Sequence, residues 1–146
     1  MPDILHRAGI KSSVDEVYAA LTTRDGLADW WTQDTHGDTN LGGVIRFRFK
    51  QGGIDMKVVE LQPSRRVRWE VVDGPQEWIG TTVSFDLKQD GEYAIVLFNH
   101  HDWKEVVDFM YHCSTKWGMF LMSVKALLET GKGASHPHDV IIGDWG

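Results

Sequence analysis

The sequence has few of the residues that build disulfide frameworks, metal sites or membrane spans. Cys113 is the only cysteine among 146 residues, so no intramolecular disulfide can form and no cysteine cluster is available for zinc. The amino-terminal stretch lacks the charged and apolar regions of a signal peptide, and no apolar run approaches the roughly 20 residues that span a bilayer. We therefore expect a cytoplasmic chain that holds no metal and does not insert into a membrane.

An excess of positive charge is also absent. The chain carries 15 Lys and Arg against 21 Asp and Glu, which gives a formal net charge of -6 at pH 7. The basic residues are scattered, apart from a cluster of Arg65, Arg66 and Arg68. Because proteins that bind nucleic acid or anionic membranes attract phosphate with a basic surface, we expect neither as a partner.

The motifs of common catalytic and cofactor sites are missing as well. No Gly-rich phosphate loop follows a predicted strand, and no Gly-x-Ser-x-Gly motif occurs. His100 and His101 are adjacent in a predicted strand, so their side chains point to opposite faces and do not share a metal ion. Cys113 and His112 lie about 100° apart on a predicted helix and do not face each other as a nucleophile and a base would. We therefore expect no cofactor and no catalytic residue.

What the chain does contain is a globular composition with an unusual number of tryptophans. Hydrophobic residues make up 42% and charged residues 25% of the chain, which is close to the globular average and argues against disorder. The length suits a single domain with its own core, which we expect to span residues 1–146. The seven Trp favour either a bulky core or a pocket with aromatic walls.

Three segments have the spacing of amphipathic helices. Ser13 and Glu16 have the spacing of a capping box before an apolar stripe, and a second, short helix is predicted over residues 27–31. From residue 104 to 129 apolar side chains recur every three or four positions, which predicts a long helix with Gly131 as its stop signal. We expect the tail that follows to be extended and to pack on the surface or against a partner.

Six segments have the apolar pattern and the flanking turns of β-strands. Short turns separate most of them, which favours antiparallel order, whereas the polar, Gly-rich stretch 32–43 is expected to be a loop. The predicted fold class is α+β, a curved antiparallel six-stranded sheet wrapped around the long C-terminal helix, with two short helices between the first and second strands. The predicted strands cover residues 4–10, 44–50, 54–61, 67–71, 79–87 and 93–99.

A curved sheet that grips one helix leaves space between them, and eight bulky side chains are candidates to line that space. Their spacing places them on the apolar faces of the predicted strands and helices. The same spacing also describes a core that side chains fill, because periodicity reports burial and not the presence of a cavity. The candidate ligand-binding residues are Trp30, Phe47, Trp69, Phe85, Met110, Cys113, Trp117 and Phe120.

Four segments resemble a known family. Residues 20–31 resemble its helix-pair segment, residues 41–43 lead into an alternating strand, Phe98–Trp103 is similar to its His-x-x-Trp junction, and residues 121–133 resemble its C-terminal signature. On these segments the chain resembles the heat-shock-protein-90 ATPase activator homologue-like family of the START-like, birch-pollen-allergen-like superfamily (SRPBCC). The resemblance covers nearly the whole chain and implies a helix-grip fold with an internal cavity. Proteins with this fold bind lipids, hormones or polyketides, and some are enzymes.

Three functions fit these observations. The one we expect is binding of a small hydrophobic molecule, lipid-like or aromatic, in the cavity between the sheet and the C-terminal helix, as a carrier or sensor. An enzyme of the cyclase or hydrolase type in the same cavity is an alternative, with Tyr18, His100, Tyr111 and His112 as the nearby polar candidates. The third is an interaction module with a filled core, resembling a chaperone cofactor or forming a homodimer.

Overall fold

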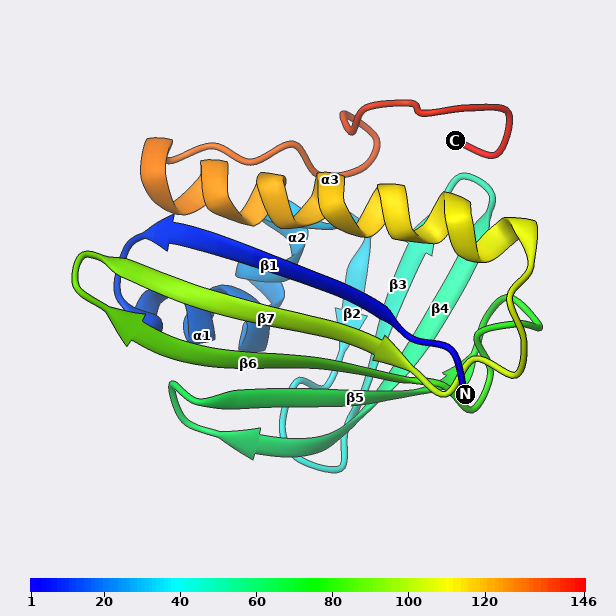
Figure 1. The fold of residues 1–146 in the computed structure, drawn as a ribbon, viewed down its shortest axis with the longest axis horizontal. Coiled ribbons are helices and arrows are strands. Elements are labelled where there is room, and N and C mark those ends of the chain that lie inside the picture. Colours follow the sequence, from blue (N-terminus) through cyan, green and yellow to red (C-terminus); the bar gives the residue numbers. More distant parts are fainter.

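The computed structural model describes residues 1–146 and contains seven strands and three helices (Figure 1). All seven strands form one antiparallel sheet in the order β1-β7-β6-β5-β4-β3-β2. The predicted α+β class and the long C-terminal helix are confirmed. None of the helices combines the length and the apolar composition needed to cross a bilayer. In chain order the elements are β1 (Ile4–Lys11), α1 (Val14–Thr22), α2 (Arg24–Trp30), β2 (Thr35–Gly37), β3 (Val44–Phe49), β4 (Gly52–Gln62), β5 (Arg66–Asp73), β6 (Thr82–Asp90), β7 (Tyr93–His101) and α3 (Asp108–Thr130).

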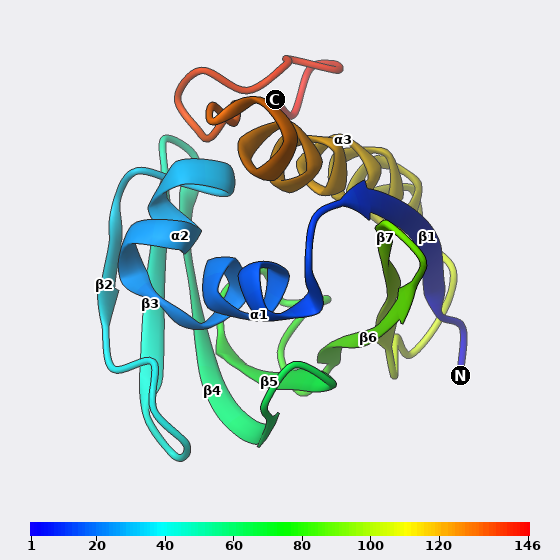
Figure 2. The same cartoon turned by 90° about the vertical axis from the view of Figure 1, so that its left-hand side faces the viewer.

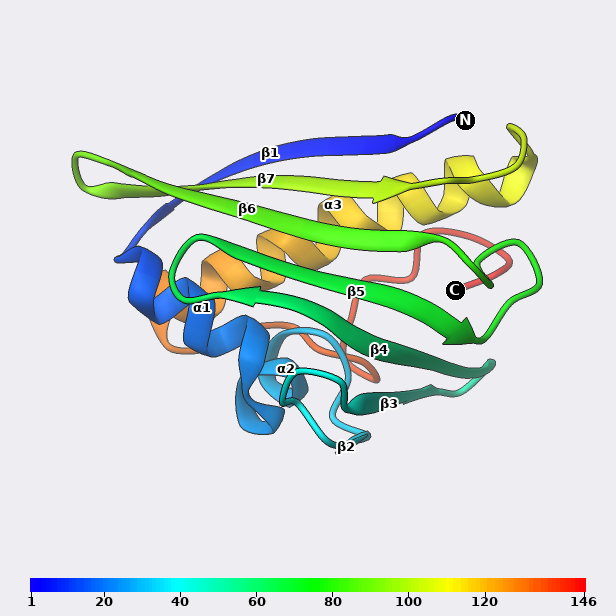
Figure 3. The ribbon, with the colours of Figure 1, turned by 90° about the horizontal axis from the view of Figure 1, so that it is seen from below.

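The sheet curves around the space beneath α3 (Figures 2 and 3). The β4–β5 ladder shifts its register between Asp55 and Met56 and again between Val58 and Glu60. Irregularities of this kind bend a strand and increase its twist. The bend at β4 therefore brings β3 and β2 round toward the helix, so that the sheet and α3 together form the predicted helix-grip arrangement.

The two short helices close one end of the curved sheet (Figure 2). Ser13 caps α1, because its Oγ accepts a hydrogen bond from the Glu16 backbone N–H at 3.2 Å. Thr23 caps α2 in the same way, through a backbone N–H of the first turn. The Trp30 indole N–H donates to the Ala20 carbonyl oxygen at 2.9 Å. This buried hydrogen bond joins α2 to α1 and fixes the position of the two helices relative to each other.

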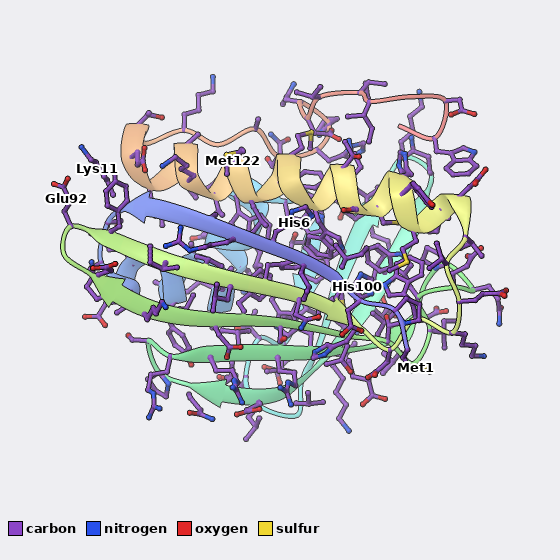
Figure 4. All side chains as sticks on the ribbon, viewed as in Figure 1. Met1, His6, Lys11, Glu92, His100 and Met122 are labelled. Atoms are coloured by element: carbon purple, nitrogen blue, oxygen red, sulfur yellow. The ribbon has the colours of Figure 1, made fainter.

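The concave face of the sheet and one face of α3 bury a common cluster of 31 hydrophobic side chains. Strand residues alternate as the period-two pattern predicts: in β1, Ile4 and Ile10 are buried and Leu5 is exposed. Each large apolar side chain removed from water contributes roughly 1.5–3 kcal/mol to stability. The His6 imidazole lies under α3 and donates to the Ser114 carbonyl oxygen at 3.0 Å (Figure 4). This contact fixes the position of α3 along β1.

Several boundaries differ from the prediction, and α2 begins at Arg24 and not at residue 27. The predicted loop 32–43 contains a seventh strand, β2, whose three residues pair with β3 and are too few to show alternation. The long helix begins at Asp108, because the backbone is still extended one residue earlier. Val106 fits the apolar spacing but lies before the helix and is 58% exposed. Ile79 is exposed in the turn that precedes β6, which begins at Thr82 and not at residue 79.

The chain after α3 runs back along the helix toward the start of α3 (Figure 1). Gly131 ends α3 in the left-handed conformation with a φ of 88°, as the predicted stop signal requires. Residues 131–146, here named the C-terminal segment, then reach the end of α2, where His136 forms a parallel bridge with Thr32. The segment packs on the surface of the protein, in agreement with the predicted extended tail.

Candidate functional site

A cleft opens at the end of the sheet that lies away from α1. It has a volume of about 990 Å³ and is bounded by the β3–β4 turn, the β5–β6 connection, the first half of α3 and the C-terminal segment. These elements meet at one end of the molecule in Figure 1. Small-molecule sites commonly measure roughly 300–1,000 Å³, so the cleft is large enough for one. Seven aromatic side chains line it: Trp31, Phe49, Trp78, Phe109, Trp117, Phe120 and Trp145.

The eight side chains predicted to line a cavity are all buried, and they divide into two groups. Cys113, Trp117 and Phe120 line the cleft from α3. Trp31 connects the two groups, because its ring centroid lies 4.2 Å from that of Phe47 and 5.0 Å from that of Trp117. The other five lie in the packed core behind the cleft: Trp30, Phe47, Trp69, Phe85 and Met110.

Several wall residues were not among the eight predicted ones. Trp78 lies in the β5–β6 connection and Trp145 in the C-terminal segment, where no periodicity marks a side chain as inward. Trp31 directly follows the predicted residue Trp30 and is placed by the end of α2. Phe49 continues the inward row of β3, so the alternation in that strand was a signal that could have identified it.

A chain of hydrogen bonds fixes two stacked tryptophans in the wall. The rings of Trp78 and Trp117 stack with centroids 5.8 Å apart and planes 17° from parallel. The Trp117 indole N–H donates to His100 Nδ1 at 3.1 Å, so the imidazole carries its proton on Nε2, which lies 2.8 Å from Thr81 Oγ1. The Thr81 hydroxyl donates to the Trp78 carbonyl oxygen at 2.5 Å. These hydrogen bonds fix the positions of the two rings relative to each other.

The two residues of catalytic type next to this network are held in their neutral forms. Burial, with a smaller contribution from the charge of His101, lowers the pKa of His100 to about 3, and both of its ring nitrogens already have partners. Burial raises the pKa of the Cys113 thiol to about 12, although the Trp78 indole N–H, 3.3 Å from Sγ, opposes this shift. The thiol in the wall is therefore protonated and is not a nucleophile, and the imidazole behind the wall has no free nitrogen with which to act as a base.

Lys116 holds the C-terminal segment against the cleft. Its ammonium donates to Asp139 Oδ2 at 2.6 Å and to the Val140 carbonyl oxygen at 2.8 Å. The His136 Nδ1–H donates to the other Asp139 oxygen at 2.9 Å, and its Nε2 accepts from the Lys50 backbone N–H. Burial alone would raise the pKa of Asp139, but Lys116 and His136 outweigh this effect and the pKa lies below its ordinary value. The ion pair therefore persists at neutral pH.

Of the four polar residues predicted as candidates for catalysis, His112 lines the cleft. Burial lowers the pKa of His112, and the charge of Lys116 acts in the same direction. His100 lies behind the wall, Tyr111 is exposed, and Tyr18 lies in α1. No group of three or more His, Cys, Asp or Glu side chains is arranged to hold a metal ion.

Residues 11–129 match the family model described as Activator of Hsp90 ATPase homolog 1-like protein. The chain belongs to this family. The resemblance seen in the sequence is thereby confirmed. A comparison with curated proteins finds no match. The C-terminal segment lies outside the part of the chain that matches the Activator of Hsp90 ATPase homolog 1-like family, so in this family member one wall of the cleft comes from beyond the family match.

Solved structures share the fold of this Activator of Hsp90 ATPase homolog 1-like chain. The Aha1 dimer from Colwellia psychrerythraea is 47% identical with a TM-score of 0.85, over 91% of this chain and 100% of that chain. DynU16, from the dynemicin biosynthetic locus, is 23% identical with a TM-score of 0.73, over 90% of this chain and 48% of that chain. CalU16 from Micromonospora echinospora is 21% identical with a TM-score of 0.72, over 87% of this chain and 74% of that chain. The fold is consistent with ligand binding.

Proposed function

We propose that this protein binds a small hydrophobic molecule, lipid-like or aromatic, in the cleft between the sheet, α3 and the C-terminal segment, as a carrier or sensor in the cytoplasm. The observation that supports this most strongly is the convergence of Trp31, Trp78, Trp117 and Trp145 on one cleft of about 990 Å³. Apolar and aromatic walls with a few polar groups are typical of small-molecule sites. Each Å² of apolar ligand surface removed from water contributes roughly 25 cal/mol to binding, before the cost of association.

The eight predicted residues have two roles in this proposal. Cys113, Trp117 and Phe120 contact the ligand, because they line the cleft. Trp145 covers it from the C-terminal segment. The remaining five support the wall from the core and do not touch the ligand: Trp30, Phe47, Trp69, Phe85 and Met110.

Native mass spectrometry of protein purified from its expression host tests the proposal, followed by denaturing extraction of any bound small molecule. We expect an apolar molecule bound at one per chain. Trp145→Ala reduces the bound fraction about fivefold, because it removes an aromatic face from the cleft. Met122→Ala is the matched control: Met122 is 50% exposed against 48% for Trp145, and it projects from the outer side of α3 (Figure 4). This variant retains the ligand.

Two results would contradict the binding function. The first is a bare mass equal to one chain, with no uptake from a mixture of lipids and aromatic compounds. The second is a bound molecule that Trp145→Ala and Met122→Ala release equally, because such a molecule would occupy some other surface.

Homodimerisation is a second candidate, and it is compatible with the first. The relative from Colwellia psychrerythraea is described as a dimer and is 47% identical over the whole of its length. Sedimentation equilibrium at micromolar concentration decides it. A mass of twice 16.6 kDa supports a homodimer, and a single-chain mass at all concentrations excludes one under those conditions.

A further inference from the structure

The cleft carries more negative than positive charge. Its walls contain five carboxylates and two cationic side chains, Arg48 and Lys116, whereas the whole chain has 21 acidic and 15 basic residues. The ratio of acidic to basic side chains is therefore higher in the cleft than in the chain as a whole. The carboxylates are Asp55, Asp73, Glu77, Asp139 and Asp144.

Both cations are already neutralised by carboxylates of the same cleft. Arg48 Nη1 lies 2.7 Å from Asp55 Oδ1, and Lys116 Nζ lies 2.6 Å from Asp139 Oδ2. The Lys116 ammonium also donates to backbone oxygens of Val140 and Gly146. All three of its N–H donors are thus in use, and it has none to offer to an anionic ligand.

Three carboxylates remain without a cationic partner. None of the nine ion pairs in the chain involves Asp73, Glu77 or Asp144. Asp73 and Glu77 belong to the end of β5 and the β5–β6 connection, and Asp144 belongs to the C-terminal segment. The uncompensated negative charge therefore comes from two different walls of the cleft.

The two histidines of the cleft do not offset this charge. Burial lowers the pKa of His112 and Lys116 lowers it further, against the opposing effect of Asp144, so this imidazole is neutral at pH 7. His136 accepts the Lys50 N–H through Nε2 and donates its Nδ1–H to a carboxylate. This is the neutral tautomer with both nitrogens in use.

Two of the three unpaired carboxylates are followed in the sequence by tryptophans that line the same cleft. Trp145 follows Asp144 directly, is half-exposed, and packs edge-to-face against Phe109 with centroids 5.7 Å apart. Trp78 directly follows Glu77 and stacks on Trp117 deeper in the wall. The face of an indole ring attracts a cation through its quadrupole. The half-exposed ring of Trp145 thus adds to the preference for positive charge next to Asp144, whereas Trp78 is buried against Trp117 and supplies apolar surface next to Glu77.

We propose that the ligand of this cleft is an apolar molecule that carries a positive charge, such as an amine or a quaternary ammonium compound. The apolar body lies against the stacked Trp78 and Trp117, and the charge lies among Asp73, Glu77 and Asp144. This inference rests on the proposed binding function and adds the charge class of the ligand. The aromatic walls of the cleft form the binding site, and the carboxylates select among the molecules that fit into it.

Isothermal titration calorimetry with three naphthalene probes of equal size tests this selection. The probes are 2-naphthylmethylamine, which is cationic at pH 7, neutral 2-naphthalenemethanol and anionic 2-naphthoate. We expect the cation to bind about tenfold more tightly than the neutral probe, and the anion to bind less tightly than either. In the triple variant Asp73→Asn, Glu77→Gln and Asp144→Asn, the ratio of the cationic to the neutral affinity falls to about two or less.

A second triple variant separates local from overall charge. Glu70→Gln, Asp90→Asn and Glu92→Gln change the net charge by the same amount at exposed positions, and Glu92 lies at the opposite end of the sheet beside Lys11 (Figure 4). This variant keeps the tenfold ratio. Equal affinities for the cationic and neutral probes in the native protein, or loss of the ratio in both triple variants, would overturn the charge selection and leave the binding function standing. Failure of all three probes to bind would overturn both.

Discussion

Lys116 Nζ lies 2.6 Å from Asp139 Oδ2, and the two side chains are 16% and 4% exposed. This ion pair joins α3 to the C-terminal segment, and Trp145 of that segment forms part of the cleft. Removing one partner from a buried ion pair leaves the other charge without compensation, which is far more destabilising than losing an exposed pair. The position of the segment, and with it the shape of the cleft, therefore depends on Lys116.

Substitution of Lys116 by Met weakens the attachment of the C-terminal segment to α3 without unfolding the sheet. The charge of Asp139 loses its partner, and the free energy of local opening falls by about 2 kcal/mol, which corresponds to roughly thirtyfold faster amide exchange. Hydrogen exchange followed by mass spectrometry of peptides from residues 132–146 measures this change. Lys125→Met is the control. Lys125 forms an ion pair with Glu129 on the same helix, and its substitution does not alter the contacts of Lys116 with the C-terminal segment. Unchanged protection in Lys116→Met would mean that other contacts hold the segment.

The attachment of the segment weakens in acid. The pKa of Asp139 lies below its ordinary value, so the carboxylate contributes its full stabilisation above about pH 5 and loses it as the pH falls through the lowered pKa. The difference in segment protection between the native protein and Asp139→Asn is therefore constant from pH 5 to pH 7 and narrows below pH 4. Amide exchange of the segment, corrected for the intrinsic pH dependence, measures it. A difference that grows as the pH falls would contradict the lowered pKa.

His100 makes the folded protein sensitive to pH in a different range. Burial and His101 lower its pKa from 6.5 to about 3, so the unfolded chain binds a proton that the folded chain does not. Stability is consequently lost as the pH falls from about 6.5 toward 3, by about 1.4 kcal/mol per pH unit from this residue. His100→Gln is less stable at pH 7 by roughly 1–3 kcal/mol, because its hydrogen bonds are disrupted.

Urea unfolding at pH 7, 5.5 and 4.5 measures this effect. The difference in the free energy of unfolding between the native protein and His100→Gln narrows as the pH falls. His138 is at an exposed position, and the difference between the native protein and His138→Gln is expected to stay constant with pH. A difference in the free energy of unfolding that does not change with pH would show that folding does not lower the pKa of His100.

Cys113 is unreactive in the folded protein. Burial raises the pKa of its thiol to about 12, and the thiolate is the form that alkylating reagents attack. Relative to the ordinary thiol value of 9.0, the shift predicts alkylation by iodoacetamide at pH 8 about a thousandfold slower than in unfolded chain. Mass spectrometry after timed quenching, with and without 6 M guanidinium as the unfolding reagent, gives both rates. Equal rates would place the thiol at the surface.

The parts of the site that periodicity predicted lie on regular elements. Cys113, Trp117 and Phe120 repeat at helical spacing, and burial of one helix face follows from that spacing. Phe47 and Trp69 were recognised as inward by alternation in their strands. Periodicity did not separate the residues that line the cleft from those that fill the core, because both kinds are buried.

The remaining wall comes from segments without a period. Trp78 lies in a turn and Trp145 in the C-terminal segment, and their positions depend on tertiary contacts such as the hydrogen bond of Lys116 to Asp139. Val106 shows the opposite case, because it fits the apolar spacing of α3 yet precedes the helix and is exposed. A sequence pattern indicates which face of an element is buried, but not where loops bring side chains to that face.

The tryptophans themselves provide the most direct test of the cleft as a binding site. Four of the seven indole N–H groups belong to cleft residues, Trp31, Trp78, Trp117 and Trp145, and three belong to core residues: Trp30, Trp69 and Trp103. Two-dimensional 1H–15N NMR resolves all seven indole resonances during a titration with neutral 2-naphthalenemethanol. A binding cleft predicts saturable shifts in the four cleft indoles and much smaller shifts in the three core indoles. Shifts of equal size in both groups, or none at all, would contradict the proposal that this cleft binds an apolar ligand.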